Sequence, residues 1–409
     1  MKRVLLTVAL CVAASSASFA QKKAVSEAQS IAKSQNADFG EARSLIKGAL
    51  ENAETKNDAK TWYVAGFIED QQFNAEKTKQ ILGQKPNEPV MYEALYSILP
   101  YFLKAYELDQ LPNEKGKVKP KYSKDIKSIL GTNRLDLFNG GAYYFDQKDY
   151  RKAYEFFNQY IDITELPMFE GTPTATKDST FMTVQFYAAV AATQLNDSKT
   201  AIAALERAKD TDYRRYDVYS YLCYEYEQAK DTANLEKTLQ SGSQVFPDSA
   251  YFLNSLINIY VSTNRNEQAL EALNTALTKQ SDDKQLANVY NVLGYVYETG
   301  MKDYPNAEKN FKMALEKDPT LVDAMANLGR VYYNQGANKR NEADQINDTK
   351  KYQEEIEVAK GFFKQALPYF KQAHEAKPDE MEYMIVLRNI YYTLNMGDEM
   401  KAIEQKMNN

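Results

Sequence analysis

Few residues in this chain are of the types that carry out acid–base, nucleophilic or metal chemistry. Its 409 residues include one histidine, His374, and two cysteines, Cys11 and Cys223. One histidine cannot form a two-histidine zinc site, and this one has no nucleophile in its context for a Ser-His-Asp set. Because His374 lies near Glu375 and Lys377, we expect a solvent-facing side chain rather than a catalytic base.

The remaining reactive residue types also favour structural roles. Cys223 stands among apolar residues, so we expect a buried packing thiol. The pairs Glu354-Glu355 and Asp282-Asp283 are expected on solvated helix faces and at helix N-termini, not as acid–base dyads. A glycosidase needs only two carboxylates across a cleft, an alternative that the sequence leaves open. The chain contains no glycine-rich phosphate loop. We therefore predict no cofactor, no metal site and no enzyme.

Composition and length restrict the class of protein. The sequence is 44% hydrophobic and 26% charged, which is typical of a soluble globular chain. Its net charge of -6 gives no electrostatic reason to bind nucleic acid. With only 16 glycines and 12 prolines, an all-β protein with many tight turns is disfavoured. A chain this long exceeds one compact core, so we expect several domains or a repeat array.

The N-terminus has the three-part pattern of a secretory signal peptide. Met1 to Arg3 is basic, Val4 to Ala14 is apolar except for Thr7, and small residues lead to Ala20. We predict a signal peptide over residues 1–20 and a periplasmic location in a bacterial envelope. A membrane anchor is the alternative, but the apolar stretch is short for a spanning helix. Lipid attachment at Cys11 is a further alternative. No later segment is long and apolar enough to span a bilayer.

Self-similarity at a spacing of 34 residues is the main signal in the sequence. Ala201, Leu235 and Ala269 each begin a helical apolar stripe at this spacing. The same spacing relates two further sets of residues, which are Leu205, Leu239 and Leu273, and the small residues Ala208, Gly242 and Ala276. Small residues at this period allow helices to approach closely. A fixed period of this length predicts a solenoid of helix pairs.

The repeats resemble the tetratricopeptide repeat (TPR) family, with its pattern W-x2-L-G-x2-Y, then A-x3-F-x2-A, then P. The closest match has one extra residue in its turn and comprises Leu293-Gly294-x2-Tyr297, Ala307-x3-Phe311-x2-Ala314 and Pro319. The other matches pair Leu328-Gly329 with Ala366-x3-Phe370, Gly141-x2-Tyr144 with Ala153-x3-Phe157, and Trp62 to Gly66 with Ile98-x3-Phe102. Ala42-x3-Ile46-x2-Ala49 is interpreted as a lone second helix.

The resemblance extends from about residue 38 to the end and implies an all-α fold. We predict an α-solenoid, a right-handed superhelix of about seven to eight TPR helix-turn-helix repeats. One set of repeats is expected over 21–167 and a second over 180–409, with a loop over 168–179 between them. An insertion over about 337–358 should begin with a polar stretch and lead into a long helix, which Pro368 should kink or break.

A lysine-rich loop over 111–124 interrupts the first set of repeats. It contains Glu114-Lys-Gly-Lys-Val-Lys-Pro-Lys121 in an otherwise acidic protein. We interpret it first as a solvated linker, and alternatively as a docking patch for an acidic partner or an anionic lipid. This loop and the late Tyr-rich extension also resemble long TPR proteins exported by Bacteroidetes-type bacteria. That resemblance implies no defined activity.

The resemblance further implies that the first helix of each pair lines the concave surface. The candidate peptide-binding residues are then Tyr224, Asn254, Asn258, Asn291, Tyr295, Asn327, Arg330 and Asn389. Asparagine both donates and accepts hydrogen bonds, and tyrosine adds flat apolar area. We therefore expect a non-catalytic scaffold that binds a protein or peptide partner. A glycan or cell-wall-fragment binding module is the alternative, as is an ordinary polar surface. The oligomeric state is left open.

Overall fold

The structure, a computed structural model, describes residues 20–407 and is helical, with no β-strand among those residues. The predicted signal peptide lies outside the described residues except for Ala20. Contacts divide the chain into two compact units, one ending at Lys230 and one beginning at Asp231. The predicted loop over 168–179 lies within the first unit.

The described part of the first unit starts within a helix that covers residues 20–32. The helices that follow are α2 (Phe39–Glu51), α3 (Ala59–Ile81), α4 (Glu88–Asp109), α5 (Ser123–Asp146), α6 (Tyr150–Glu165), α7 (Ser179–Thr193), α8 (Ser198–Ala208) and α9 (Arg215–Gln228). Two short 3₁₀ turns, η1 (Pro167–Phe169) and η2 (Pro173–Ala175), lie in the long loop before α7.

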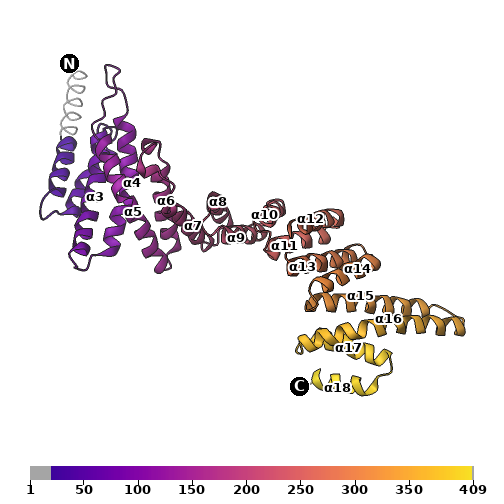
Figure 1. Cartoon of the computed structure of the whole chain (residues 1–409). Helices are drawn as coiled ribbons and strands as arrows, with labels where there is room; N and C mark the ends of the chain where they lie inside the picture. The colour runs from indigo at the N-terminus through magenta and orange to yellow at the C-terminus, as the bar shows by residue number, and fades with distance from the viewer. Residues whose placement is uncertain (1–19, 408–409) are drawn as a thin grey trace, which may run out of the picture. The chain divides into compact units, whose positions relative to one another are not determined.

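The second unit continues the same pattern (Figure 1). Its helices are α10 (Thr232–Val245), α11 (Ala250–Ser262), α12 (Asn266–Lys279), α13 (Asp283–Tyr295), the π-helical turn η3 (Val296–Gly300), α14 (Tyr304–Lys317), α15 (Val322–Ala343), α16 (Thr349–Ala376), α17 (Met381–Thr393) and α18 (Gly397–Met407). Within each unit, each helix packs mainly on its neighbours in the chain. The predicted all-α solenoid is confirmed.

The hairpin turns show why the helices end where they do. Single residues in the left-handed conformation terminate first helices, as at Lys148 (φ 60°), Asn196 (φ 52°) and Lys302 (φ 57°). An aspartate follows each of them and caps the next helix; the side chain of Asp303, for example, accepts a hydrogen bond from the Asn306 N–H at 3.1 Å. Stop and start signals therefore occupy adjacent residues and keep the turns short.

A glycine beneath a phenylalanine ring holds the two helices of a hairpin together. A Cβ placed on Gly66 would lie 2.5 Å from the ring of Phe102, and one on Gly329 would lie 2.9 Å from the ring of Phe370. The TPR pattern in the sequence assigned these same residues to the two helices of one repeat, including Phe370 in the displaced second helix. Both rings are almost fully buried. Only glycine at these positions allows such close approach.

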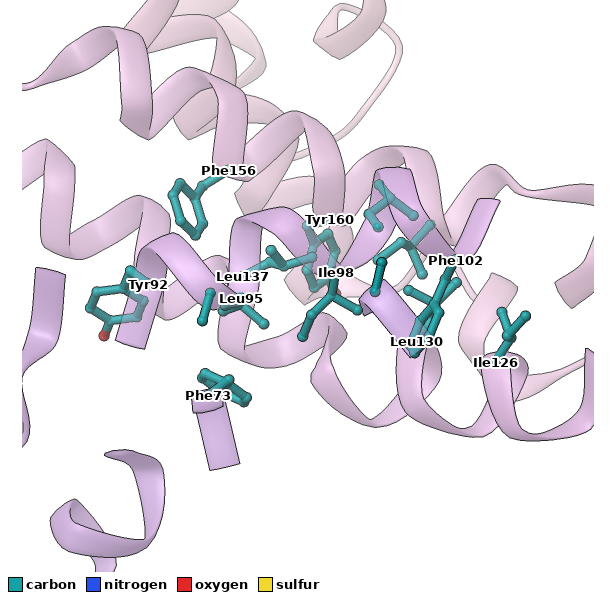
Figure 2. Close-up of a cluster of buried hydrophobic side chains, with 14 of the residues drawn as sticks. Phe73, Tyr92, Leu95, Ile98, Phe102, Ile126, Leu130, Leu137, Phe156 and Tyr160 are labelled. Atoms are coloured by element: carbon teal, nitrogen blue, oxygen red, sulfur yellow. The ribbon is translucent and has the colours of Figure 1, made fainter. Parts of the chain in front are cut away.

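Each unit contains a large apolar cluster built from several hairpins. In the first unit, large side chains from consecutive hairpins meet in one cluster (Figure 2), which includes Phe73, Leu95, Phe102, Leu130 and Tyr160. In the second unit, Phe311, Phe363, Phe370 and Leu387 belong to the equivalent cluster. No hairpin buries its apolar face alone, so each depends on its neighbours in the array.

The array begins earlier than the sequence motifs indicated. Ala42, Ile46 and Ala49 of α2 were interpreted as a lone second helix, and this was wrong. The helix over residues 20–32 precedes α2, and its Val25 and Ala28 are buried in the same cluster as Ile46. Its apolar stripe consists mostly of alanine and lacks the glycine and tyrosine landmarks of the other hairpins.

The predicted insertion is mostly helical. α15 continues through its polar stretch to Ala343, which is fully buried, and only residues 344–348 separate it from α16. The predicted long helix is confirmed. Pro368 does not break it, because α16 is helical without interruption from Thr349 to Ala376. None of the helices within residues 20–407 combines the length and apolarity needed to cross a bilayer.

Candidate functional site

Polar side chains link the first helices of the hairpins in the second unit. These helices are α11, α13 with η3, α15 and α17, and α13 contacts α15 while α11 contacts η3. We call the predicted site residues on these helices, together with the polar side chains that bond to them or to one another, the polar face. It comprises Asn254, Asn258, Asn291, Tyr295, Glu298, Asn327, Arg330, Tyr333, Asn334, Glu382 and Asn389.

Two asparagines join α13 to α15. The side-chain amide of Asn327 donates a hydrogen bond to Oδ1 of Asn291 at 2.9 Å. Oδ1 of Asn327 in turn accepts a hydrogen bond from Nη2 of Arg330 at 2.5 Å. All three side chains are half-buried. Some of the donors and acceptors of the predicted residues therefore bond to the neighbouring repeat. The Nδ2 group of Asn291 takes no part in the Asn291–Asn327 hydrogen bond.

A buried carboxylate, Glu298, occupies the centre of the polar face. Its Oε1 lies 3.4 Å from Nε of Arg330 and accepts a hydrogen bond from the side chain of Asn334 at 3.1 Å. Burial raises the pKa of Glu298, and the charge of Arg330 only partly opposes this. Within the described residues, its Oε2 has no hydrogen-bond partner. Nη1 of Arg330 also lies 3.8 Å from Glu382 of α17.

The last link of the polar face joins α15 to α17. The side chain of Asn389 donates a hydrogen bond to the hydroxyl of Tyr333 at 3.4 Å. Arg388 donates to Oδ1 of the same asparagine at 3.2 Å. The face therefore contains amides, tyrosines and one arginine paired with two carboxylates.

A pocket opens between α11 and η3 at the other end of the polar face. Its lining residues are Asn258, Val261, Ser262, Asn264, Tyr295, Thr299 and Gly300. The carbonyl of Gly300 accepts a hydrogen bond from the side chain of Asn266 at 2.9 Å, which ties η3 to α12. The lining has no charged side chain. Neutral amides and hydroxyls beside a tyrosine ring suit a neutral polar ligand group.

The structure brings most of the predicted site residues to this one face. Asn258 and Tyr295 share the pocket, and Asn254 lies one helical turn before Asn258. Tyr224 is 56% exposed but belongs to α9 in the first unit, so it is not part of the face. That these residues bind a peptide stays a prediction.

Sequence reasoning missed Glu298, Tyr333, Asn334 and Glu382. The signal that could have found Glu298 is the extra residue noted between Tyr297 and Ala307. The chain accommodates that residue in the wide turn η3, and this turn places Glu298 against Arg330. π-Turns of this kind often occur at functional sites.

The expectation for His374 was wrong. Its side chain is only 8% exposed, because it follows Phe370 by one helical turn on the buried stripe of α16. Burial is the main cause that lowers its pKa, and the nearby Lys406 of α18 adds to this. Within the described residues, neither ring nitrogen has a hydrogen-bond partner. A group facing the core in this way is not placed to act on a substrate.

The other candidates for chemistry have the structural roles expected of them. Cys223 is 2% exposed, as predicted for a packing thiol. Asp282 caps α13 by accepting from the Gln285 N–H at 3.0 Å, also as predicted. Among residues 20–407, no group of three or more histidine, cysteine or acidic side chains is arranged to hold a metal ion.

Comparisons with known proteins give no match to a protein-family model and none to a curated protein. Several solved structures are similar to the chain. A TPR protein from Bacteroides fragilis is 20% identical over 63% of this chain and 98% of its own, with a TM-score of 0.35. The C-terminal part of a TPR protein from Cytophaga hutchinsonii is 16% identical over 66% and 93%, with a TM-score of 0.40. MamA is 18% identical over 49% and 98%, with a TM-score of 0.30.

Proposed function

We propose that this chain is a non-catalytic scaffold that binds an extended segment of a partner protein along the polar face. The observation that carries the proposal is a run of amide and tyrosine side chains over the first helices: hydrogen bonds join α13 to α15 and α15 to α17, and Asn258 of α11 lines a pocket with Tyr295 of α13. Amide groups match the alternating donors and acceptors of a peptide backbone and do not select for its side chains. Rigid aromatic rings add contact area at low entropic cost.

The charge of the polar face supports a partner segment that is polar and carries little net charge. Arg330 is shared between Glu298 and Glu382, so its positive charge is already paired and is not free to attract an anionic segment. The pocket beside η3 is lined without charge. A strongly charged ligand would gain little here and would lose its hydration. We propose export to the periplasm as the setting, which is supported by the N-terminal sequence pattern.

Selection from a displayed library of unstructured peptides tests this function. We expect enriched peptides whose binding weakens by about tenfold or more in the variant Asn258→Ala/Asn291→Ala. The matched control is Lys309→Ala, on the exposed side of α14, which should bind as the wild type does. If no peptide is enriched, or if both variants bind equally well, the polar face is not the binding site.

The same purified proteins, together with a Tyr295→Ala variant, can be tested for binding to cell-wall saccharide fragments. The tyrosine ring and neutral lining of the pocket beside η3 also suit a sugar ring, which is the specific observation in favour of the alternative function. Saccharide binding that depends on Tyr295, without peptide binding, would replace the scaffold proposal with a glycan-binding module.

A further inference from the structure

The lysine-rich loop of the first unit is held by hydrogen bonds at its tip and at its base, unlike a flexible linker. It spans the residues between α4, which ends at Asp109, and α5, which begins at Ser123. Figure 1 shows it rising beyond the adjacent helix ends. At its tip, the Gly116 N–H donates to the Asn113 carbonyl at 2.8 Å, with Gly116 in the left-handed region at φ +69°. The Asn113 N–H donates to the Lys117 carbonyl at 3.0 Å, which closes the turn.

The base of the loop is fixed to the helices. One oxygen of Asp109 accepts from the Lys121 N–H and the other accepts from the Tyr122 N–H, each at 2.9 Å. The ring of Tyr122 stacks on Tyr63 of α3, with ring centroids 4.5 Å apart. The sequence between these anchors is therefore held in place, away from the apolar core.

The loop concentrates positive charge in a short segment. Its four lysines are all exposed; they are Lys115, Lys117, Lys119 and Lys121. None of them forms an ion pair within residues 20–407. Glu114 is the only acidic residue among them. Four exposed lysines within seven residues form a local cationic patch in a chain of net charge -6, and such a patch attracts anions.

We infer that this loop docks the first unit on an anionic lipid surface. Its cations are lysines, which act as point charges toward phosphate groups, whereas the loop contains no arginine for paired recognition of protein carboxylates. Val118 and Leu111 are 50% and 57% exposed in the same loop. Apolar side chains beside lysines suit the boundary between headgroups and acyl chains. The docking concerns the first unit and does not rest on the proposed function of the polar face.

Vesicle co-sedimentation of the full chain tests the inference. Vesicles of phosphatidylglycerol mixed with phosphatidylcholine are compared with vesicles of phosphatidylcholine alone, at low and at physiological ionic strength. The test variant changes all four loop lysines to glutamine. The control variant removes the same amount of charge at exposed sites of the second unit, by changing Lys279, Lys284, Lys350 and Lys401 to glutamine.

We expect the wild type and the control variant to bind the anionic vesicles, with binding that weakens as salt is added. The loop variant should bind about tenfold more weakly or worse, with an unchanged thermal midpoint. Residues 1–20 are common to every variant, so their contribution cancels in the comparison. The inference is overturned if the wild type does not prefer anionic vesicles, as expected if the loop binds an acidic protein. Equal effects of the two variants also overturn it, because net charge alone then governs binding.

Discussion

Gly294 of α13 lies directly beneath the ring of Phe311 of α14. A Cβ on Gly294 would lie 2.5 Å from Cε1 of that ring, and Phe311 has no exposed surface. The two residues belong to the two halves of one sequence motif, so their contact sets the distance between the helices of the hairpin.

Gly294→Ala should destabilise the second unit by about 1–3 kcal/mol, because the added methyl forces the helices apart. Denaturant unfolding followed by circular dichroism measures the change. Gly361→Ala is the matched control, since a Cβ there meets nothing within 4 Å. Alanine is the better helix former, so the control should gain about 0.5–1 kcal/mol. Two alanine substitutions with the same effect would show that the Gly294–Phe311 contact does not govern helix spacing.

Asp109→Ala should release the lysine-rich loop. Asp109 accepts hydrogen bonds from the Lys121 and Ser123 N–H groups and from the Ser123 hydroxyl, and so caps α5 from the end of α4. We expect trypsin to cut after Lys115, Lys117 and Lys121 much faster in the variant, while the Lys119–Pro120 bond resists trypsin. Glu107→Ala, on the same turn but exposed, should digest at the wild-type rate. An unchanged digestion rate in the Asp109 variant would contradict the anchoring role.

The Asp109 contacts also give a pH dependence. Burial by itself would raise the pKa of Asp109, but the hydrogen bonds from Lys121, Ser123 and Tyr122 outweigh it and hold the pKa below its ordinary value of 3.8. The folded pKa lies below the unfolded one, so the stabilisation is present above the unfolded pKa and is lost as the pH falls. Tryptic cutting cannot be followed at such acidity. Hydrogen exchange of the Tyr122 and Ser123 amides should therefore accelerate as the pH is lowered, beyond the intrinsic trend.

His374 should titrate below its ordinary pKa of 6.5, because burial disfavours the charged ring. As the only histidine, it gives a single imidazole Cε1–H resonance, and its titration in untagged protein measures the pKa directly. The imidazole is protonated near pH 6.5 in the unfolded chain but only at lower pH in the folded chain. The free energy of unfolding therefore falls as the pH drops through this range. The slope reaches at most about 1.4 kcal/mol per pH unit. His374→Leu should remove this slope between pH 7 and 5, and a variant that keeps it would assign the effect elsewhere.

Cys223 should not react with thiol reagents in the native state. Burial raises the pKa of its thiol to about 12, so almost no thiolate is present at neutral pH. In Cys11→Ser protein, a disulfide reagent should label nothing until denaturant is added and then label one equivalent. Tyr224→Cys in a Cys11→Ser/Cys223→Ala background places a thiol at an exposed position one residue away and should react at once. Rapid labelling of native Cys223 would mean that α9 opens readily.

The repeat landmarks predicted the hairpins, because glycine and phenylalanine at fixed spacing have one efficient packing solution. Gly66–Phe102 and Gly329–Phe370 both follow this rule, even where the intervening segments differ in length. The burial of a side chain was harder to predict where it depends on a helix outside the residue's own hairpin. His374 appeared polar by its sequence neighbours, but its surroundings are set by the neighbouring hairpin.

The candidate site was predicted in part for the same reason. Helical spacing identified Asn258, Asn291 and Asn327 as residues of one side of successive first helices. It could not show that Asn327 bonds Asn291, or that Arg330 is shared by two carboxylates, since such pairings depend on rotamers and on the distance between helices.

The wide turn η3 bears on how the lengths of such chains change during evolution. An added residue in a regular helix rotates everything after it by about 100° and moves its apolar stripe out of register. Here the five residues from Val296 to Gly300 absorb the addition, and Phe311 still meets Gly294. A single added residue is therefore accommodated where this first helix ends, and the packing between the two helices of the hairpin is kept.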